Sequence, residues 1–425
     1  MQRPFPAEAF LLEATYAKTR LPVDFASTLI PDAYVSPEFY ALEQERVFAK
    51  SWVPVCVPDE VRMPGQFHVV EVAGRSIIVT RNQQGELRAH HNVCRHRGSR
   101  LCEGSGQVRR FFSCPYHAWG YDLDGACLGT PLFTPESEVP VDQRATFDMS
   151  DVKAFDKADM GLYPVRVAEW GCLIFVCLDP DTPELACELG DLPERLAGYR
   201  LDEFRLARRV EYPISANWKL VGENFMEYYH LPWVHPGLVK VSPVDSHYRW
   251  QGPGMYVGFC TTPIAANTED GGFEGLAAIS GLTAEDAESA RFAWLFPNVA
   301  INVLPNHVMM LLAVPNGPGR TAEVLYLLTH PESEAKSLDT AGDIDALTTF
   351  WDVVNREDVG IVERVQDGVR NPAYQGGRMC YRFEASCHRF QNMIVDKMLG
   401  VPGIPPGDDE EAVRMFGPRG RAVRA

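Results

Sequence analysis

Two short motifs, each pairing one cysteine with one histidine, place the strongest constraint on how this chain can fold. Cys94 and His96 lie in the sequence CRHRG, and Cys114 and His117 lie in CPYHAW. Residues 97–113 separate the two motifs, so we expect them on two loops of one small unit. Two thiolates and two imidazoles brought together in this way can hold one inorganic centre.

Two kinds of centre use this set of ligands. A structural zinc ion takes two Cys and two His in tetrahedral geometry, but zinc sites usually pair Cys with Cys and His with His. Here each loop supplies one thiolate and one imidazole. This arrangement suits a two-iron, two-sulfide cluster in which one iron binds both Cys and the other binds both His, which raises the reduction potential. We therefore predict a Rieske cluster; a zinc site and unrelated core residues are the alternatives. Its ligands are Cys94, His96, Cys114 and His117.

A second set of possible metal ligands begins at His230 and His235. A helix that Asn217 can cap is predicted to run through Tyr229 and to stop at Leu231, because a proline follows and disfavours helix for the residue before it. Two His and one carboxylate on one face of an iron form a facial triad, which leaves positions open for oxygen and substrate. The remaining histidines lack a partner at ligand spacing and are interpreted as ordinary: His68, His90, His91, His247, His307, His330 and His388.

A long amphipathic helix, predicted over residues 343–369, supplies the carboxylate. At about 100° per residue, Asp358 lies roughly 20° from the centre of the apolar stripe, Glu357 lies about 80° away and Glu363 points to solvent. A carboxylate on a buried face needs a counter-charge or a metal. We predict Asp358 as the third ligand, and a buried salt bridge is the alternative.

Composition and charge exclude several classes of function. The chain has 40 Lys and Arg against 57 Asp and Glu, a net charge of −17, which argues against a nucleic-acid or anionic-membrane partner. No apolar run approaches the roughly 18 to 20 residues of a membrane span, and the N-terminal sequence lacks the pattern of a secretory signal. Eleven cysteines are too sparse for a disulfide scaffold. We expect a cytoplasmic enzyme.

Strand and helix patterns divide the chain into three parts. Residues 1–50 form a segment expected to pack on the catalytic domain, residues 51–178 form a small all-β unit, and residues 179–425 mix long helices with strands. Neither GxGxxG nor GxxxxGK[ST] occurs, so a nucleotide-binding domain is not expected. Electrons for redox chemistry must then come from a separate protein.

Taken together, the motifs resemble those of the catalytic alpha subunit of Rieske non-heme iron oxygenases over nearly the whole chain. They are CRHRG and CPYHAW, then NWK, EN and EYYH with a following His, and finally EDVGIVERVQ. The resemblance implies an α+β protein, with an all-β Rieske [2Fe-2S] domain and a helix-grip catalytic domain of antiparallel sheet and long helices. It also implies a mononuclear Fe(II), a homotrimer, and electrons from NAD(P)H through a separate reductase or ferredoxin.

The family resemblance also gives a role to Glu227. In that family an acid three residues before the first iron-binding His links the cluster of one subunit to the iron of the next. Glu227 is expected to share a helix face with His230 and to accept hydrogen bonds from it and from His117 of a neighbouring subunit. Ring-hydroxylating members usually carry Asp here, whereas Glu resembles the subgroup acting on choline, betaine and carnitine.

A quaternary ammonium substrate calls for aromatic side chains around an N-methyl cation. The candidates are Tyr228, Tyr229, Trp233, Tyr248, Trp250, Tyr256, Phe259, Trp294 and Phe296. The predicted reaction is O2-dependent monooxygenation or oxidative dealkylation of a quaternary ammonium or N-methyl compound. Hydroxylation or O-/N-demethylation of an aromatic acid or xenobiotic is the alternative. An electron carrier holding only the cluster would leave His230, His235 and Asp358 without a function.

Overall fold

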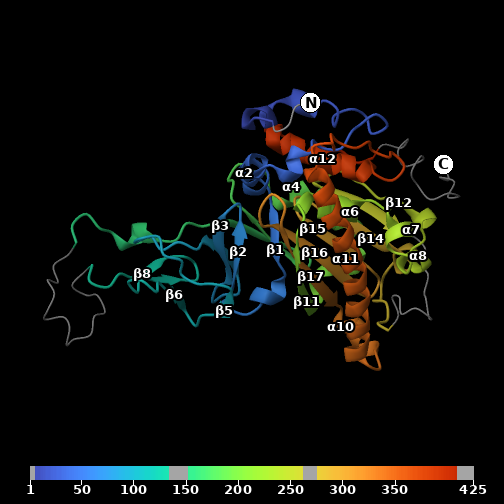
Figure 1. Cartoon of the computed structure of the whole chain (residues 1–425). Helices are drawn as coiled ribbons and strands as arrows, with labels where there is room; N and C mark the ends of the chain where they lie inside the picture. The colour runs from blue at the N-terminus through green and yellow to red at the C-terminus, as the bar shows by residue number, and fades with distance from the viewer. Residues whose placement is uncertain (1–4, 134–151, 262–274, 409–425) are drawn as a thin grey trace. The chain divides into compact units, whose positions relative to one another are not determined.

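The computed structural model describes residues 5–133, 152–261 and 275–408 (Figure 1). The chain divides into two compact units. One comprises Met1–Pro54 together with Asp181–Ala425, and the other is Val55–Pro180. Helices and antiparallel sheets both contribute, so the predicted α+β class is confirmed.

The smaller unit is built from short antiparallel strands. Its four-stranded sheet has the order β4-β3-β2-β5, with β2 (Gln66–Val72), β3 (Arg75–Arg81), β4 (Leu87–His91) and β5 (Ser105–Gln107). A second sheet has the order β6-β7-β8, with β6 (Phe111–Ser113), β7 (Gly120–Asp122) and β8 (Cys127–Gly129). A third joins β1 (Val53–Cys56), β10 (Leu173–Cys177) and β9 (Arg166–Trp170). The loop after β4 carries Cys94 and His96, and the loop between β6 and β7 carries Cys114 and His117.

One antiparallel sheet of seven strands forms the centre of the larger unit, in the order β11-β17-β16-β15-β14-β13-β12. Its strands are β11 (Arg205–Ile214), β12 (His247–Arg249), β13 (Tyr256–Thr261), β14 (Ala290–Leu295), β15 (Val299–Val303), β16 (His307–Pro315) and β17 (Thr321–Thr329). Six strands follow chain order as a meander, and β11 pairs with the last of them. The residues of β13 and β15 are buried throughout, as expected for strands covered on both faces.

Within the described ranges, four longer helices accompany this sheet: α2 (Pro37–Arg46), α6 (Trp218–Met226), α11 (Thr340–Arg370) and α12 (Ala385–Leu399). The shorter ones are α1 (Asp32–Val35), α4 (Leu185–Leu189), α5 (Leu192–Arg195), α7 (Leu231–Val234), α8 (Leu238–Val241), α9 (Ala284–Ala287) and α10 (Pro331–Lys336). Helix α6 contacts β13 through β16, and α11 contacts both α6 and β11. Figure 1 shows α11 running across the sheet. Among the described residues, every helix is too short or too polar to span a bilayer.

A buried ion pair fixes the N-terminal segment to α6. The Lys219 Nζ lies 2.7 Å from Oε1 of Glu43 on α2, and both side chains are fully buried. The Trp218 Nε1 donates to the other oxygen of Glu43 at 2.8 Å. Both charges and the indole N–H are therefore satisfied, as burial requires.

The predicted end of the helix before His230 was wrong. Asn217 caps α6 as expected, since its side chain accepts a hydrogen bond from the backbone N–H of Lys219 at 3.0 Å. The helix nevertheless ends at Met226, and Glu227 is extended. The reason is local, because the Glu227 carboxylate accepts the backbone N–H groups of Tyr229 and His230 and so replaces helical hydrogen bonds.

Candidate metal centres and substrate pocket

The four predicted cluster ligands lie on two loops of the smaller unit, where Cys94 contacts Cys114 and His96 contacts His117. The thiols of Cys94 and Cys114 are buried. Burial opposes ionisation of Cys114, but backbone N–H groups of Tyr116 and His117 outweigh it and lower its pKa. The imidazoles of His96 and His117 lie side by side, with ring centroids 4.6 Å apart.

The surroundings of these side chains fit an iron–sulfur cluster. Nδ1 of His96 is buried and has no hydrogen-bond partner among the described residues, so it presents a free ligand atom. Trp119 stacks on the same ring at 4.9 Å and fixes its orientation. The Tyr121 hydroxyl accepts the N–H of Arg95 at 3.0 Å, and its own proton is then directed at Sγ of Cys94, 3.3 Å away.

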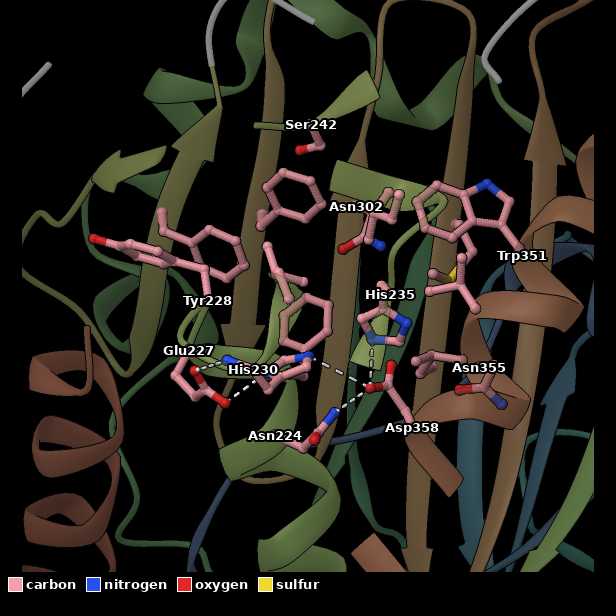
Figure 2. A pocket seen from close by; sticks show the side chains of 18 of the residues that line it. Asn224, Glu227, Tyr228, His230, His235, Ser242, Asn302, Trp351, Asn355 and Asp358 are labelled. Atoms are coloured by element: carbon pink, nitrogen blue, oxygen red, sulfur yellow. Dashed lines mark hydrogen bonds and ion pairs between the residues drawn. The ribbon is translucent and has the colours of Figure 1, made fainter. Parts of the chain in front are cut away.

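His230, His235 and Asp358 converge in the larger unit (Figure 2). Asp358 Oδ1 lies 2.8 Å from His235 Nε2 and 3.5 Å from His230 Nε2. One ligand atom from each of the three residues lies within 4.8 Å of the others. Among the described residues, this is the only group of three His, Cys, Asp or Glu side chains that satisfies this spacing. Two imidazoles and one carboxylate form the donor set of a facial triad.

A second layer of polar side chains orients the three residues. The Glu227 Oε1 lies 2.5 Å from Nδ1 of His230, although the two residues do not share a helix. The Asn224 Nδ2 donates to Oδ1 of Asp358 at 2.6 Å. Both contacts leave the His230 Nε2 and the carboxylate facing the centre of the group, as shown in Figure 2.

Two further acids of helix α11, Glu357 and Glu363, lie differently from what its helical phase suggested. Glu357 was placed well off the apolar stripe, yet its Oε2 lies 2.7 Å from Nδ1 of His235. Glu363, expected to point to solvent, is half-buried and accepts the backbone N–H of Ser215 at 2.8 Å. A glutamate side chain is long enough to reach a neighbour that lies off the direction of its own Cα–Cβ bond.

The electrostatics of the three residues fit a bound cation. Burial lowers the pKa of His230, but hydrogen bonds to Asp358 and Glu227 outweigh it and raise the pKa to about 9. Burial raises the pKa of Asp358, and the two imidazoles lower it to about 2. The carboxylate is thus anionic and demands positive charge at the centre of the group. A divalent iron supplies this charge, and the donor set suits it.

An aromatic pocket of about 660 Å³, counting space open to solvent, adjoins the three residues. It is lined by Asn224, Phe225, Glu227, Tyr228, His230, Leu231, His235, Leu238, Ser242, His247, Phe259, Phe292, Asn302, Met309, Leu311, Trp351, Val354, Asn355 and Asp358. Phe259 and Phe292 stack in parallel, with centroids 4.7 Å apart. The walls are mostly apolar, with a few polar groups between them, which is typical of a small-molecule site.

Most of the residues predicted for the aromatic cage do not line this pocket. Of the nine candidates, Tyr228 and Phe259 line the pocket. Trp233 is 74% exposed and Tyr229 is 46% exposed. The sequence reasoning missed Phe225, Phe292 and Trp351, and it set His247 aside as ordinary. Trp351 lies seven residues, about two helical turns, before Asp358 and so shares its face of the amphipathic helix, which was the one available signal.

Known protein families match the two compact units of the chain separately. The family described as Rieske [2Fe-2S] domain matches residues 51–154, and the family described as ring hydroxylating alpha subunit (catalytic domain) matches residues 201–400. A glycine betaine monooxygenase oxygenase subunit from Chromohalobacter salexigens is 30% identical over 398 residues, covering 86% of this chain and 84% of that protein. A chloroplastic choline monooxygenase from Atriplex hortensis is 29% identical, covering 87% of this chain and 78% of that protein. A carnitine monooxygenase oxygenase subunit from Acinetobacter baumannii is also 29% identical, with 85% and 91% covered.

Solved structures share the fold. A quaternary ammonium Rieske monooxygenase, whose structure concerns carnitine oxidation and inter-subunit electron transfer, superposes with a TM-score of 0.74 at 24% identity, covering 94% of this chain and 100% of that one. Naphthalene 1,2-dioxygenase from a Rhodococcus species superposes with a TM-score of 0.64 at 21% identity, covering 93% and 99%. The same fold therefore occurs in a quaternary ammonium monooxygenase and in an aromatic-ring dioxygenase.

Proposed function

This chain is a catalytic alpha subunit of the Rieske non-heme iron oxygenase family, and from that premise we propose that it monooxygenates a small quaternary ammonium or N-methyl compound. The observation that supports this substrate class most directly is the aromatic pocket beside His230, His235 and Asp358. Relatives named for choline, glycine betaine and carnitine point in the same direction.

We assign the two cofactors of the family to the two groups of side chains. The Rieske [2Fe-2S] cluster would be held by Cys94, His96, Cys114 and His117, and the mononuclear iron by His230, His235 and Asp358. When bound, the cluster supplies electrons and the iron supplies the site of O2 activation.

The protein's own contribution is orientation. Glu227 and Glu357 accept from Nδ1 of the two imidazoles, which fixes each Nε2 toward the pocket. Asn224 holds one oxygen of Asp358. These contacts keep three ligand atoms in place while the opposite side of the group stays open to the substrate pocket.

The walls of the pocket suit an N-methyl cation. The rings of Phe225, Phe259 and Phe292 form a continuous aromatic surface, with neighbouring centroids 5.9 and 4.7 Å apart. Ring faces attract a cation through their negative quadrupole, and they bury its methyl groups. One oxygen atom of O2 would enter a C–H bond next to nitrogen, and the other would be reduced to water by two electrons from the reductase and two protons. The hydroxylated carbon would then collapse to an aldehyde and release the amine, which amounts to oxidative dealkylation.

The assembly is part of the same proposal. We expect a homotrimer in which Glu227 also accepts from His117 of a neighbouring subunit, so that electrons pass between the two metal centres. A separate reductase or ferredoxin would pass electrons from NAD(P)H to the cluster. A cytoplasmic location, where these donors occur, also stays a prediction.

The decisive experiment combines metal analysis with an oxygen-uptake screen. The purified protein should contain about three irons per chain, two in the cluster and one in the mononuclear site. With a surrogate reductase, quaternary ammonium compounds should stimulate O2 uptake with matching product, and aromatic acids should not. Asp358→Ala should keep the visible spectrum of the cluster and lose both the mononuclear iron and turnover, whereas Cys114→Ala should be colourless. Uptake with aromatic acids alone would contradict the proposed substrate class.

A further inference from the structure

One polar residue interrupts an apolar row on the floor of the pocket. Phe259 pairs with Phe292, Phe292 pairs with Asn302, and Asn302 pairs with Met309 across four adjacent strands of the sheet. Directly opposed residues point to the same face of a sheet, and all four line the pocket. Asn302 therefore presents an amide where its three neighbours present apolar groups.

The oxygen of this amide is buried without a partner. Asn302 is 2% exposed, and its Oδ1 has no hydrogen-bond partner within the described part of the chain. In the view of Figure 2, the amide lies between Ser242 and the imidazole of His235. A buried carbonyl oxygen that accepts no hydrogen bond destabilises the fold, so such a group in a pocket is available to a donor on a ligand or to water.

A second polar group in the pocket is a histidine of fixed tautomer. Nδ1 of His247 lies 2.8 Å from the carbonyl oxygen of Pro243, which can only accept. The proton is thus on Nδ1, and Nε2 presents a lone pair 3.3 Å from the hydroxyl of Ser242. Burial lowers the pKa of His247 to about 4, so the ring is neutral at physiological pH.

Away from Glu227 and the three metal-site residues, the polar side chains Asn302, Ser242 and His247 of the pocket are therefore neutral. Among the described residues that line it, none is Lys or Arg, and the anionic side chains are those of Glu227 and Asp358 beside the metal site. A substrate carboxylate placed here would be desolvated without a cation to pair with it, which is costly. A hydroxyl group needs only neutral partners, and an amide can both donate to it and accept from it.

We propose that Asn302 binds a hydroxyl group of the substrate, and that the substrate is accordingly an N-methylated amino alcohol. This inference rests on the proposed function and narrows its substrate class. The aromatic rings hold the cationic end, and the amide selects the compound that carries a hydroxyl at the right separation from nitrogen. A site built to bind a hydroxyl discriminates strongly against an analogue that lacks it.

Three probe compounds test this assignment: choline, glycine betaine and propyltrimethylammonium, which replaces the hydroxyl of choline by a methyl group. The wild-type protein should prefer choline to the propyl compound by about 10- to 100-fold in kcat/KM. Asn302→Leu, which keeps the branched shape and the number of side-chain heavy atoms and removes the amide, should bring this ratio close to one. Leu312→Met alters an apolar residue of strand β16 that does not line the pocket, and it should leave the ratio unchanged. Calorimetric dissociation constants under anaerobic conditions should follow the same pattern without any electron supply.

The outcomes separate the two proposals. An Asn302→Leu protein that keeps the wild-type ratio overturns the role of Asn302 while leaving the function intact. Equal use of glycine betaine and choline by the wild-type protein overturns the assignment to an amino alcohol. Oxidation of none of the three compounds contradicts the proposed function and removes this inference with it.

Discussion

Glu357 holds the imidazole of His235 from the side opposite Asp358. The Glu357 Oε2 lies 2.7 Å from Nδ1 of His235, while Asp358 Oδ1 lies 2.8 Å from Nε2 of the same ring. Two consecutive residues of helix α11 thus contact both nitrogens of one histidine. The first contact fixes the tautomer that leaves Nε2 free to bind a metal, and the second places a carboxylate beside that atom.

Glu357→Gln should weaken the mononuclear site without removing it. The variant loses the negative charge that makes the imidazole a better ligand, so iron affinity should fall by about 10- to 100-fold. Iron retained after dialysis against a graded series of chelator concentrations, normalised to the absorbance of the cluster, measures this. Glu363→Gln is the matched control, since Glu363 lies on the same helix and accepts a hydrogen bond from the backbone N–H of Ser215. Equal iron retention by both variants would refute the role given to Glu357.

Glu227→Gln should leave reduction of the cluster intact and block electron transfer from the cluster to the mononuclear iron. The variant keeps a carbonyl acceptor near His230 and loses the charge, so both metals should stay bound and the cluster should be reduced normally by a chemical reductant. Little product should then form in a single turnover. Glu227→Asp shortens the side chain by one methylene, about 1.5 Å, and a misplacement near 1 Å costs on the order of 100-fold. Full single-turnover yield from Glu227→Gln would exclude Glu227 from the electron path.

Tyr121→Phe should lower the reduction potential of the cluster. The hydroxyl donates to Sγ of Cys94, and this hydrogen bond stabilises the more negative, reduced state. The visible spectrum should persist, because the variant removes no ligand. A spectroelectrochemical titration measures the potential, with Tyr163→Phe as the control, since Tyr163 is 54% exposed in the same unit. An unchanged potential in Tyr121→Phe would mean that the hydroxyl does not donate to the sulfur.

Lys219→Met should destabilise the larger unit strongly. It leaves the carboxylate of Glu43 buried without its cation, which costs about 3 to 5 kcal/mol. A second change, Glu43→Gln, removes the charge, keeps an acceptor for the indole of Trp218 and should restore most of the loss. Urea midpoints followed by tryptophan fluorescence measure both effects. Glu211→Gln breaks an exposed ion pair with Arg209 and should change little. A double variant as unstable as the single one would argue against this explanation.

Glu223 should make a contribution to stability that is lost as the pH rises from about 4.5 to 7. Burial raises the pKa of this side chain from 4.5 to about 7, although Tyr34 and Gln391 donate to it. The native state then binds more protons than the unfolded state across this interval, so deprotonation costs stability as the pH rises. The Glu223→Gln variant cannot lose this proton. Its free energy of unfolding should therefore rise by about 3 kcal/mol relative to that of the wild-type protein between these two pH values. Parallel pH profiles for the two proteins would contradict this.

Local patterns in the sequence were enough to predict the fold class, the family and the choice of candidate ligands. Short spacings place Cys94 with His96 and Cys114 with His117, because residues so close in sequence occupy one loop. The helical period likewise selected Asp358, since the burial of one face of α11 depends mainly on residues of that helix. Both the motif spacings and the helical period can be read from short stretches of sequence.

The tertiary structure decided what depends on distant contacts. The conformation of Glu227 follows from hydrogen bonds that end α6 at Met226, which no periodicity shows. The contact of Glu357 with His235 joins two segments far apart in sequence. The pocket floor, in which Asn302 lies between Phe292 and Met309, exists only because three strands pair in one register. A shift by one residue would turn Asn302 to the other face of the sheet, so its place in the pocket is a property of the assembled sheet.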